Sequence, residues 1–219
     1  MRSRLLSSSI GSKLLIALTG LGLFSFLVAH LSGNLLFLVS PRAFNEYGHA
    51  VVNNPLIYAI ELGLVVVFLV HVYSTVRLYA GARIARPERY AVKRWAGAPS
   101  RKSVASSTMI FTGIIIVGFV ILHLRAFKFG PWYESPEGIR DLYRLQLEVF
   151  SRPGYVAFYM LAMVLIGFHL WHGIPSAAQS LGIDHPKYTP RIIRIGRVVA
   201  VLIAVGFFIL PLYTFLGGR

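Results

Sequence analysis

The sequence contains no cysteine and few charged residues. Without cysteine the chain can form neither a disulfide nor a thiolate metal site, and its redox compartment stays undetermined. Charged residues make up 14% of the chain, against about a quarter in a typical soluble domain. Acidic residues are the scarcest, with 8 aspartates and glutamates against 22 lysines and arginines. This composition excludes an ordinary soluble domain and favours an integral membrane protein.

What the sequence does contain is long apolar runs. Hydrophobic residues make up 56% of the chain, and the mean hydropathy is +0.66. A run of about 20 apolar residues spans a bilayer as a helix. Five runs reach this length, at about 14–39, 56–80, 104–127, 154–177 and 195–216. The rest of the chain is short connections, so we predict one all-α integral membrane domain over residues 1–219, a bundle of five transmembrane helices in the lipid bilayer.

The net charge of +14 could suggest nucleic-acid binding, but its distribution indicates membrane topology instead. The connection between the second and third spans has one acid and eight basic residues: Arg77, Arg83, Arg86, Arg89, Lys93, Arg94, Arg101 and Lys102. The connection between the fourth and fifth spans is also basic, and the other two are nearly balanced. The positive-inside rule then puts the N-terminus and both basic connections in the cytoplasm, and the C-terminus outside. The basic connections could also dock a soluble partner.

The outer connection over residues 128–153 is predicted to hold a short amphipathic helix. Ser135-Pro136-Glu137 is a plausible helix start, and apolar residues recur at helical spacing from Ile139 to Val149. We expect this helix to lie on the membrane interface, with Trp132 and Tyr133 at the level of the lipid headgroups.

Histidine occurs in four of the five predicted spans, as His30, His71, His123 and the pair His169 and His172. Two further histidines, His49 and His185, are expected in solvated loops. Ionisable residues inside a membrane are costly and usually face the bundle interior, where they pair or bind ligands. For any single histidine the alternative is a hydrogen-bonded packing role, but one in each of four helices forms a pattern.

Residue counts divide these histidines into two layers. His71 and His169 each follow a proline near a helix start by 16 residues, which is about 24 Å from the outer surface. His30 and His123 lie 11 and 8 residues before prolines that follow their helices, about 12–16 Å from that surface. Two facing histidines per layer are what a haem with two axial imidazoles requires, and bundles build such sites from facing helices. Zinc or copper would need three or four ligands in one layer.

The two histidines of the fourth span differ in depth. His172 lies about 4.5 Å deeper than His169, out of step with His71, so depth favours His169 as the ligand. His172 is then expected near the cytoplasmic face, where it could hydrogen-bond a haem propionate or a partner subunit, or simply lie at the interface.

Four stretches carry a resemblance to a known family: "FLVAHLSGNLLF" (26–37), "FNEYGHAVVNNPLIYAIELGLVVVFLVHVYSTVRLY" (44–79), "GFVILHLRAF" (118–127) and "GFHLWHGIPSAAQSLG" (167–182). Over nearly its whole length the chain resembles the cytochrome b membrane-anchor subunit of succinate:quinone oxidoreductases and fumarate reductases, of the five-helix, di-haem type. In that family a glycine follows the fourth-helix ligand four positions on. Gly173 satisfies this for His169, whereas His172 has Ser176 at the same offset.

The resemblance implies two haems b, an outer one whose iron is held by His30 and His123 and an inner one held by His71 and His169. It implies a flavoprotein subunit and an iron–sulfur subunit on the cytoplasmic side of the inner (cytoplasmic) membrane. It also implies a membrane quinone, expected to be menaquinone, as substrate. Electrons would pass between the iron–sulfur subunit and the quinone, and bis-histidine ligation would leave no open iron position. The dicarboxylate site would belong to the flavoprotein, and no nucleic-acid partner is expected.

Three further residues are site candidates. Glu61 lies about 9 Å below the outer surface and, as an intramembrane carboxylate, could exchange protons with the quinone or serve as a structural hydrogen-bond partner. Arg77 and Arg125 lie near the haem layers and could pair with propionates or extend to the interface.

Some fumarate-reducing members carry a glutamate just before the fourth-helix histidine, where this chain has Gly167 and Phe168. That departure favours the succinate-oxidising direction.

Two alternatives remain open at this point. One is a di-haem, quinone-linked cytochrome b that anchors a different dehydrogenase. The other, from a different functional class, is a transporter or structural membrane protein whose histidines carry protons or merely pack. A transporter of this kind would lack a visible-band chromophore.

Overall fold

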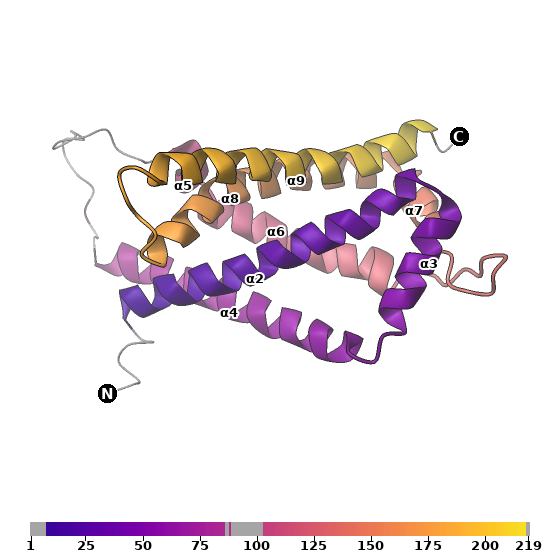
Figure 1. Cartoon of the computed structure of the whole chain (residues 1–219), viewed down its shortest axis with the longest axis horizontal. Coiled ribbons are helices and arrows are strands. Elements are labelled where there is room, and N and C mark those ends of the chain that lie inside the picture. The colour runs from indigo at the N-terminus through magenta and orange to yellow at the C-terminus, as the bar shows by residue number, and fades with distance from the viewer. Residues whose placement is uncertain (1–7, 86–87, 89–102, 218–219) are drawn as a thin grey trace.

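The computed structural model describes residues 8–85, 88 and 103–217, and within these residues the fold is all-α (Figure 1). The elements in chain order are α2 (Ser9–Leu35), the 3₁₀ turn η1 (Leu36–Leu38), α3 (Pro41–Val52), α4 (Ile57–Ile84), α5 (Val104–Ser107), α6 (Met109–His123), the π-helix η2 (Leu124–Lys128), α7 (Leu142–Phe150), α8 (Pro153–Ser180) and α9 (Thr189–Gly217). Five segments are long and apolar enough to cross a membrane: Ser9–Leu38, Ile57–Ile84, Met109–Lys128, Pro153–Ser180 and Thr189–Gly217. The predicted five-helix class is confirmed.

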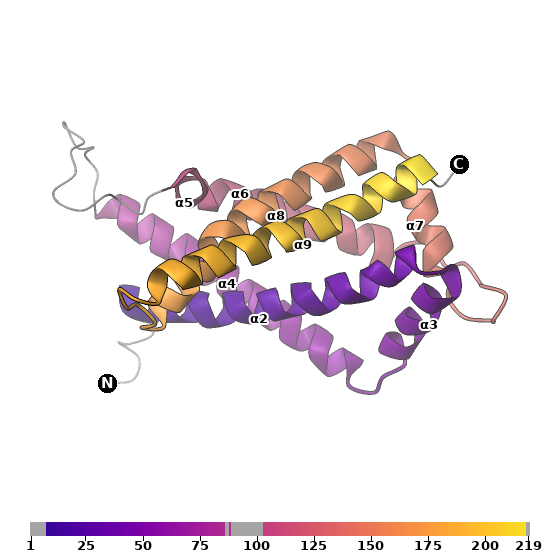
Figure 2. The same cartoon turned by 45° about the horizontal axis from the view of Figure 1, so that its top comes forward.

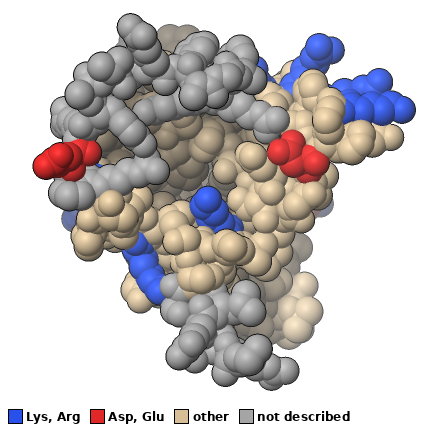
Figure 3. All heavy atoms as spheres, turned by 90° about the vertical axis from the view of Figure 1, so that its left-hand side faces the viewer, with Lys and Arg blue, Asp and Glu red and all other residues tan. Residues whose placement is uncertain are grey.

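The five long helices run side by side, and the two ends of the chain lie at opposite ends of the bundle (Figures 1 and 2). The N-terminal end of the bundle also holds α5 and the connection between α8 and α9. The C-terminal end holds α3 and α7. Figure 3 looks onto the N-terminal end, where lysine and arginine side chains are spread over the face. Most of the predicted basic connection, including Arg86, Arg89 and Lys93, lies outside the described residues.

Helix starts follow local capping chemistry. The Ser8 hydroxyl accepts a hydrogen bond from the Gly11 amide at 3.0 Å and caps α2. Proline occupies the first turn of α8 at Pro153, one residue from the predicted start. Helix α4 begins at Ile57, two residues after Pro55, because Asn54 and Pro55 form a turn that precedes it.

The prediction that the outer helix begins at Ser135-Pro136-Glu137 is wrong. Helix α7 begins at Leu142, capped by Asp141, whose carboxylate accepts from the Arg144 amide at 2.9 Å. The segment before it is a tight turn closed by pairing of Glu134 with Arg140. Gly138 occupies this turn at φ +72°, a conformation that favours glycine. Helical spacing alone therefore placed the start too early.

Helix α3 lies in a segment expected to be a plain connection, so the placement of His49 in a loop is wrong as well. The helix is held by its buried residue Asn45, whose amide donates to the Asp141 carboxylate at 2.9 Å. The carbonyl of the same side chain accepts from the Tyr143 amide at 2.9 Å. These contacts tie α3 to the start of α7. His185 does lie in a turn between α8 and α9, as expected.

Two polar side chains hold the segment before α7: Arg140 attaches it to the end of the third span, and Tyr133 attaches it to α7 itself. Arg140 donates from Nη2 to the Phe127 carbonyl at 2.9 Å, and burial lowers the pKa of its guanidinium. The Tyr133 hydroxyl donates to the Glu148 carboxylate, and this hydrogen bond raises the pKa of Tyr133. The C-terminal end of the bundle is therefore a folded cap.

The core of the bundle is centred on α8. Its Tyr159, Ala162, Met163 and Ile166 side chains are buried, and α8 packs most extensively against α9. A Cβ atom at Gly167 would approach the Ala204 side chain to 2.9 Å. Small residues of this kind let membrane helices approach closely. Helix α4 packs mainly along α2 and buries little of its own surface, which leaves its other faces available to ligands, lipid or partners.

Candidate functional site

The outer histidine pair lies between α2 and the end of α6. The ring centroids of His30 and His123 are 5.7 Å apart, with their planes at 87°. Both residues are half-buried. The structure therefore brings together the two histidines that the residue counts assigned to the outer layer.

Aromatic rings surround the outer pair. Phe26 stacks on His30 at a centroid distance of 5.2 Å, and Phe119 stacks on His123 at 5.5 Å. Phe127 lies 5.3 Å from His123. Polar contacts to the two rings are long: the Tyr159 hydroxyl lies 3.4 Å from His123 Nδ1, and the Asn34 amide nitrogen lies 3.4 Å from His30 Nδ1. Such distances are at the weak end for hydrogen bonds, so packing holds this layer.

The inner pair joins α4 to α8. The ring centroids of His71 and His169 are 6.5 Å apart, with their planes at 62°. Both residues are half-buried. It is His169, not His172, that faces His71 in the structure. His172 is also half-buried and lies three residues further toward the end of α8.

Threonine hydroxyls, rather than aromatic rings, contact the inner pair. Thr19 Oγ1 on α2 lies 3.1 Å from His71 Nδ1, and Thr112 Oγ1 on α6 lies 3.1 Å from His169 Nδ1. A glycine follows each threonine. A Cβ atom at Gly20 would lie 3.3 Å from His71 Cε1, and one at Gly113 would lie 3.8 Å from His169 Cε1. The inner imidazoles thus rest on helix surfaces that lack side chains at the point of contact.

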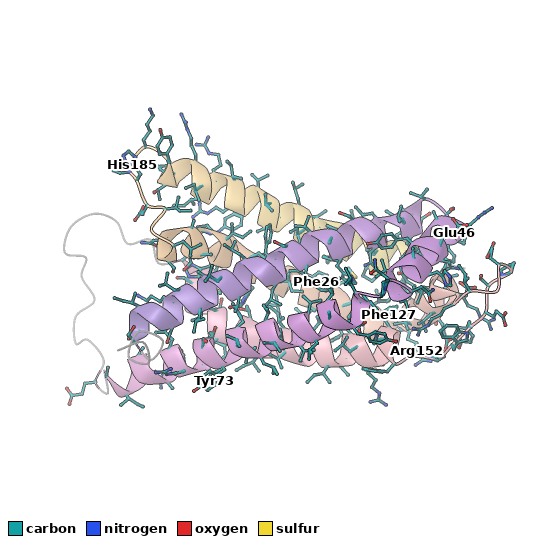
Figure 4. The ribbon with its side chains drawn as sticks, turned by 60° about the horizontal axis from the view of Figure 1, so that its bottom comes forward. Phe26, Glu46, Tyr73, Phe127, Arg152 and His185 are labelled. Carbon is teal, nitrogen blue, oxygen red and sulfur yellow. The ribbon has the colours of Figure 1, made fainter. Side chains whose placement is uncertain are left out.

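The two layers are separated along the bundle. Thr19, which contacts the inner layer, lies eleven residues before His30 on the same helical run, and Thr112 lies eleven residues before His123. At the α-helical rise this corresponds to about 16 Å on both α2 and α6. Figure 4 shows the separation: Tyr73, two residues after His71, lies toward the N-terminal end, whereas Phe26 and Phe127 lie toward the other end.

The other predicted residues lie at the edges of this arrangement. Glu61 near the start of α4 forms an ion pair with Lys128 at the end of η2. Both side chains are partly exposed, at 37% and 42%. Arg125 is exposed within η2, two residues after His123, and Arg77 is exposed on α4, six residues after His71.

Sequence reasoning missed several of these residues. Lys128 faces Glu61 at the end of a π-helical turn that directly follows His123, and such turns are frequent at functional sites. The two Thr-Gly pairs were also missed. A signal for them exists, because each pair stands at the same eleven-residue offset before an outer-layer histidine.

The donor set of each layer suits a metal whose other ligands come from a cofactor. Among the described residues there is no group of three or more histidine, cysteine, aspartate or glutamate side chains that could hold a metal ion. Each layer therefore supplies two imidazoles. Imidazole nitrogens bind metals at about 2 Å, so two rings on opposite sides of one ion have centroids about 6 Å apart. The observed 5.7 and 6.5 Å fit a haem iron with two axial histidines.

A comparison with curated proteins agrees with this chemistry. The chain is 26% identical over 182 residues to the "Succinate dehydrogenase cytochrome b558 subunit" of Bacillus subtilis (strain 168), and the match covers 82% of each chain. No family model matches the chain, and no solved structure matches it. Five apolar helices of spanning length and similarity to a succinate dehydrogenase cytochrome b subunit together indicate a multi-pass membrane protein related to an oxidoreductase complex.

Proposed function

We propose that this chain is the membrane-anchor cytochrome b subunit of a succinate:quinone oxidoreductase and binds one haem b between each histidine pair. The observation that carries the proposal is the presence of two facing imidazole pairs, stacked along the bundle about 16 Å apart. His30 and His123 would hold the outer haem, and His71 and His169 the inner one. Haem b supplies reversible one-electron transfer when it is bound.

The protein's own residues orient and shield the two cofactors in this proposal. Phe26 and Phe119 cover the outer imidazoles, while Thr19 and Thr112 contact the inner ones. Two histidines at each haem would leave no open position for substrate, so the haems would serve electron transfer alone. Arg77 and Arg125 are candidates for propionate contacts because each lies near one layer and is exposed. His172, one turn beyond His169, is a further candidate.

The orientation of the bundle in the membrane decides at which end soluble subunits can dock. The basic connections join helix ends at the N-terminal end of the bundle, and the positive-inside rule supports a cytoplasmic position for that end. The membrane in this proposal is the inner (cytoplasmic) one. An iron–sulfur subunit and a flavoprotein would dock there, nearer the inner histidine pair. Quinone, expected to be menaquinone, would react toward the C-terminal end, nearer the outer pair.

Quinone chemistry also needs a proton carrier, and Glu61 is the candidate. Its carboxylate lies at the C-terminal end, where it forms an ion pair with the Lys128 ammonium. An ionised carboxylate can take up a proton when a quinol is oxidised, and the protonated form can donate one when a quinone is reduced. Gly167 and Phe168 stand where some fumarate-reducing relatives carry a glutamate, so we propose succinate oxidation as the direction.

Co-purification tests this function. The chain should be tagged, expressed from its native host, and isolated in mild detergent. We expect a flavoprotein and an iron–sulfur protein in a fixed ratio to the chain, and succinate-dependent reduction of menaquinone analogues by the complex. Recovery of a different dehydrogenase would support the alternative anchor. Recovery of a folded chain alone, without a visible-band chromophore, would favour the hypothesis that the chain is a transporter.

A further inference from the structure

Each inner histidine is contacted by a Thr-Gly pair on a neighbouring helix. His71 of α4 meets Thr19 and Gly20 of α2, and the Nδ1–Oγ1 distance is 3.1 Å. On the other side of the layer, His169 of α8 meets Thr112 and Gly113 of α6 at the same distance. The two halves of the inner layer are therefore built alike, although the helices are far apart in sequence.

The other partners of the two hydroxyls bear on the direction of these bonds. A threonine hydroxyl has one hydrogen to donate and can also accept. Thr19 donates its hydrogen to the Leu15 carbonyl at 2.5 Å, and Thr112 donates to the Met109 carbonyl at 3.0 Å. With its hydrogen engaged there, each oxygen is placed to accept from the ring, and this arrangement matches the tautomer that carries its hydrogen on Nδ1. In a neutral imidazole the other nitrogen, Nε2, is left with its lone pair.

We infer that Thr19 and Thr112 are positioning residues for the inner haem, which fix the Nε2-binding tautomer and the orientation of both axial imidazoles. The inference rests on the proposed function. A metal-bound histidine that donates its second N–H to a fixed acceptor is oriented by that acceptor and becomes a more basic ligand. Two such acceptors would support the ligands of one haem here, one from each side of the layer.

The adjacent glycines allow this contact. At Gly20 even a methyl group would lie 3.3 Å from His71 Cε1, so a side chain there would press on the ring that Thr19 holds. The same helices also supply the outer ligands eleven residues later, at His30 and His123. Helices α2 and α6 thus each provide one outer ligand and one support for an inner ligand.

Among the described residues, no acceptor lies as close to an outer imidazole as the threonine hydroxyls lie to the inner ones. The Asn34 amide nitrogen donates to the His30 carbonyl at 2.7 Å, and an amide NH₂ group cannot accept from a ring N–H. The Tyr159 hydroxyl is 3.4 Å from His123 Nδ1. Loss of a threonine hydroxyl should therefore affect the inner haem alone.

The test uses Thr19→Val and Thr112→Val in the intact complex, since valine keeps the shape and removes the hydroxyl. Thr75→Val is the matched control, because the Thr75 hydroxyl donates to the backbone carbonyl of His71 at 2.8 Å and not to the ring. Haem content, the low-spin ferric EPR signals and the midpoint potential of each haem should be measured. Thr19→Ser, which restores the hydroxyl, provides a rescue.

We expect both valine variants to raise the potential of the inner haem and to shift its EPR signal, because a less basic ligand stabilises the ferric state less. The outer haem and the Thr75→Val variant should be unchanged, and Thr19→Ser should return toward the wild type. Thr112→Val tests the inference independently if Thr19→Val does not assemble. If the inner haem has the same potential and EPR signal in both valine variants as in Thr75→Val, the inference is overturned but the proposed function is not. A wild-type complex without haem would overturn the proposed function with it.

Discussion

The outer and inner histidine pairs have similar ring separations, 5.7 and 6.5 Å, but different surroundings. Phenylalanine rings stack on the outer imidazoles, whose polar contacts are 3.4 Å or longer. Threonine hydroxyls at 3.1 Å and bare glycine backbone meet the inner ones. The groups that hydrogen-bond to or pack on the ligands of a metal tune that metal, so this difference predicts two haems that are distinguishable by potential and by spectrum.

The largest expected effect is the complete loss of one haem. His169→Ala should reduce the haem content from two per chain to one by removing the inner haem, because one axial ligand is lost. His172→Ala is the matched control on the same helix and should keep both haems. His30→Ala should give the mirror result, with the inner haem retained. A pyridine haemochrome assay on each purified variant measures the number of haems per chain. Loss of the inner haem in His172→Ala alone would show that the ligand assignment is wrong.

The next largest effect concerns quinone turnover at the C-terminal end. Glu61→Gln should lower the rate of succinate-dependent quinone reduction by about 100-fold, the typical contribution of a general acid or base, while both haems stay bound. Glu46→Gln is the control, since Glu46 also forms an ion pair at that end, with Arg42 at 2.7 Å. Steady-state assays with a menaquinone analogue measure both. Equal rates in the two variants would leave Glu61 a structural residue.

A smaller effect is expected from substitutions at the two glycines that contact the inner histidines. Gly20→Ala places a methyl group 3.3 Å from His71 Cε1, so the ring must move by a few tenths of an ångström, whereas Gly113→Ala makes an ordinary contact at 3.8 Å. We expect Gly20→Ala to shift the EPR signal of the inner haem and Gly113→Ala to leave it unchanged. Equal shifts in the two variants would argue against a role for the closer contact.

The smallest effect is expected in the outer layer. Tyr159→Phe removes the hydroxyl 3.4 Å from His123 Nδ1 and keeps the buried ring. The outer haem potential should change by less than the inner one does in Thr19→Val, and stability should fall by less than about 1 kcal/mol. Redox titration and thermal unfolding of the complex check both points. A larger change than in Thr19→Val would reverse the contrast between the layers.

The spans could be predicted from the sequence because the hydrophobic requirement of a bilayer acts on continuous runs. The residue counts from Pro55 and Pro153 also predicted that His71 and His169 lie at one level, since a regular helical rise converts residue number into depth. The structure accordingly brings His71 opposite His169 and His30 opposite His123. Their role as iron ligands stays a prediction.

The missed features depend on contacts between distant residues. Helix α3 is held by Asn45 through Asp141 and Tyr143, which lie 96 and 98 residues away. Thr19 meets a histidine 52 residues along the chain, and Thr112 meets one 57 residues along. The start of α7 depends on the turn at Gly138. Hydrophobic periodicity carries no information on such pairings, and the shared eleven-residue offset of the two threonines does not by itself say which histidine each one contacts.

A haem count on the wild-type chain decides whether both histidine layers bind haem. The complex should be purified in mild detergent from a host that supplies haem, and a pyridine haemochrome assay combined with dithionite-reduced minus oxidised spectra. We expect two low-spin haems b per chain, one for each histidine layer. A folded sample with one haem would contradict the two-layer assignment, and a folded sample with none would contradict the proposed function.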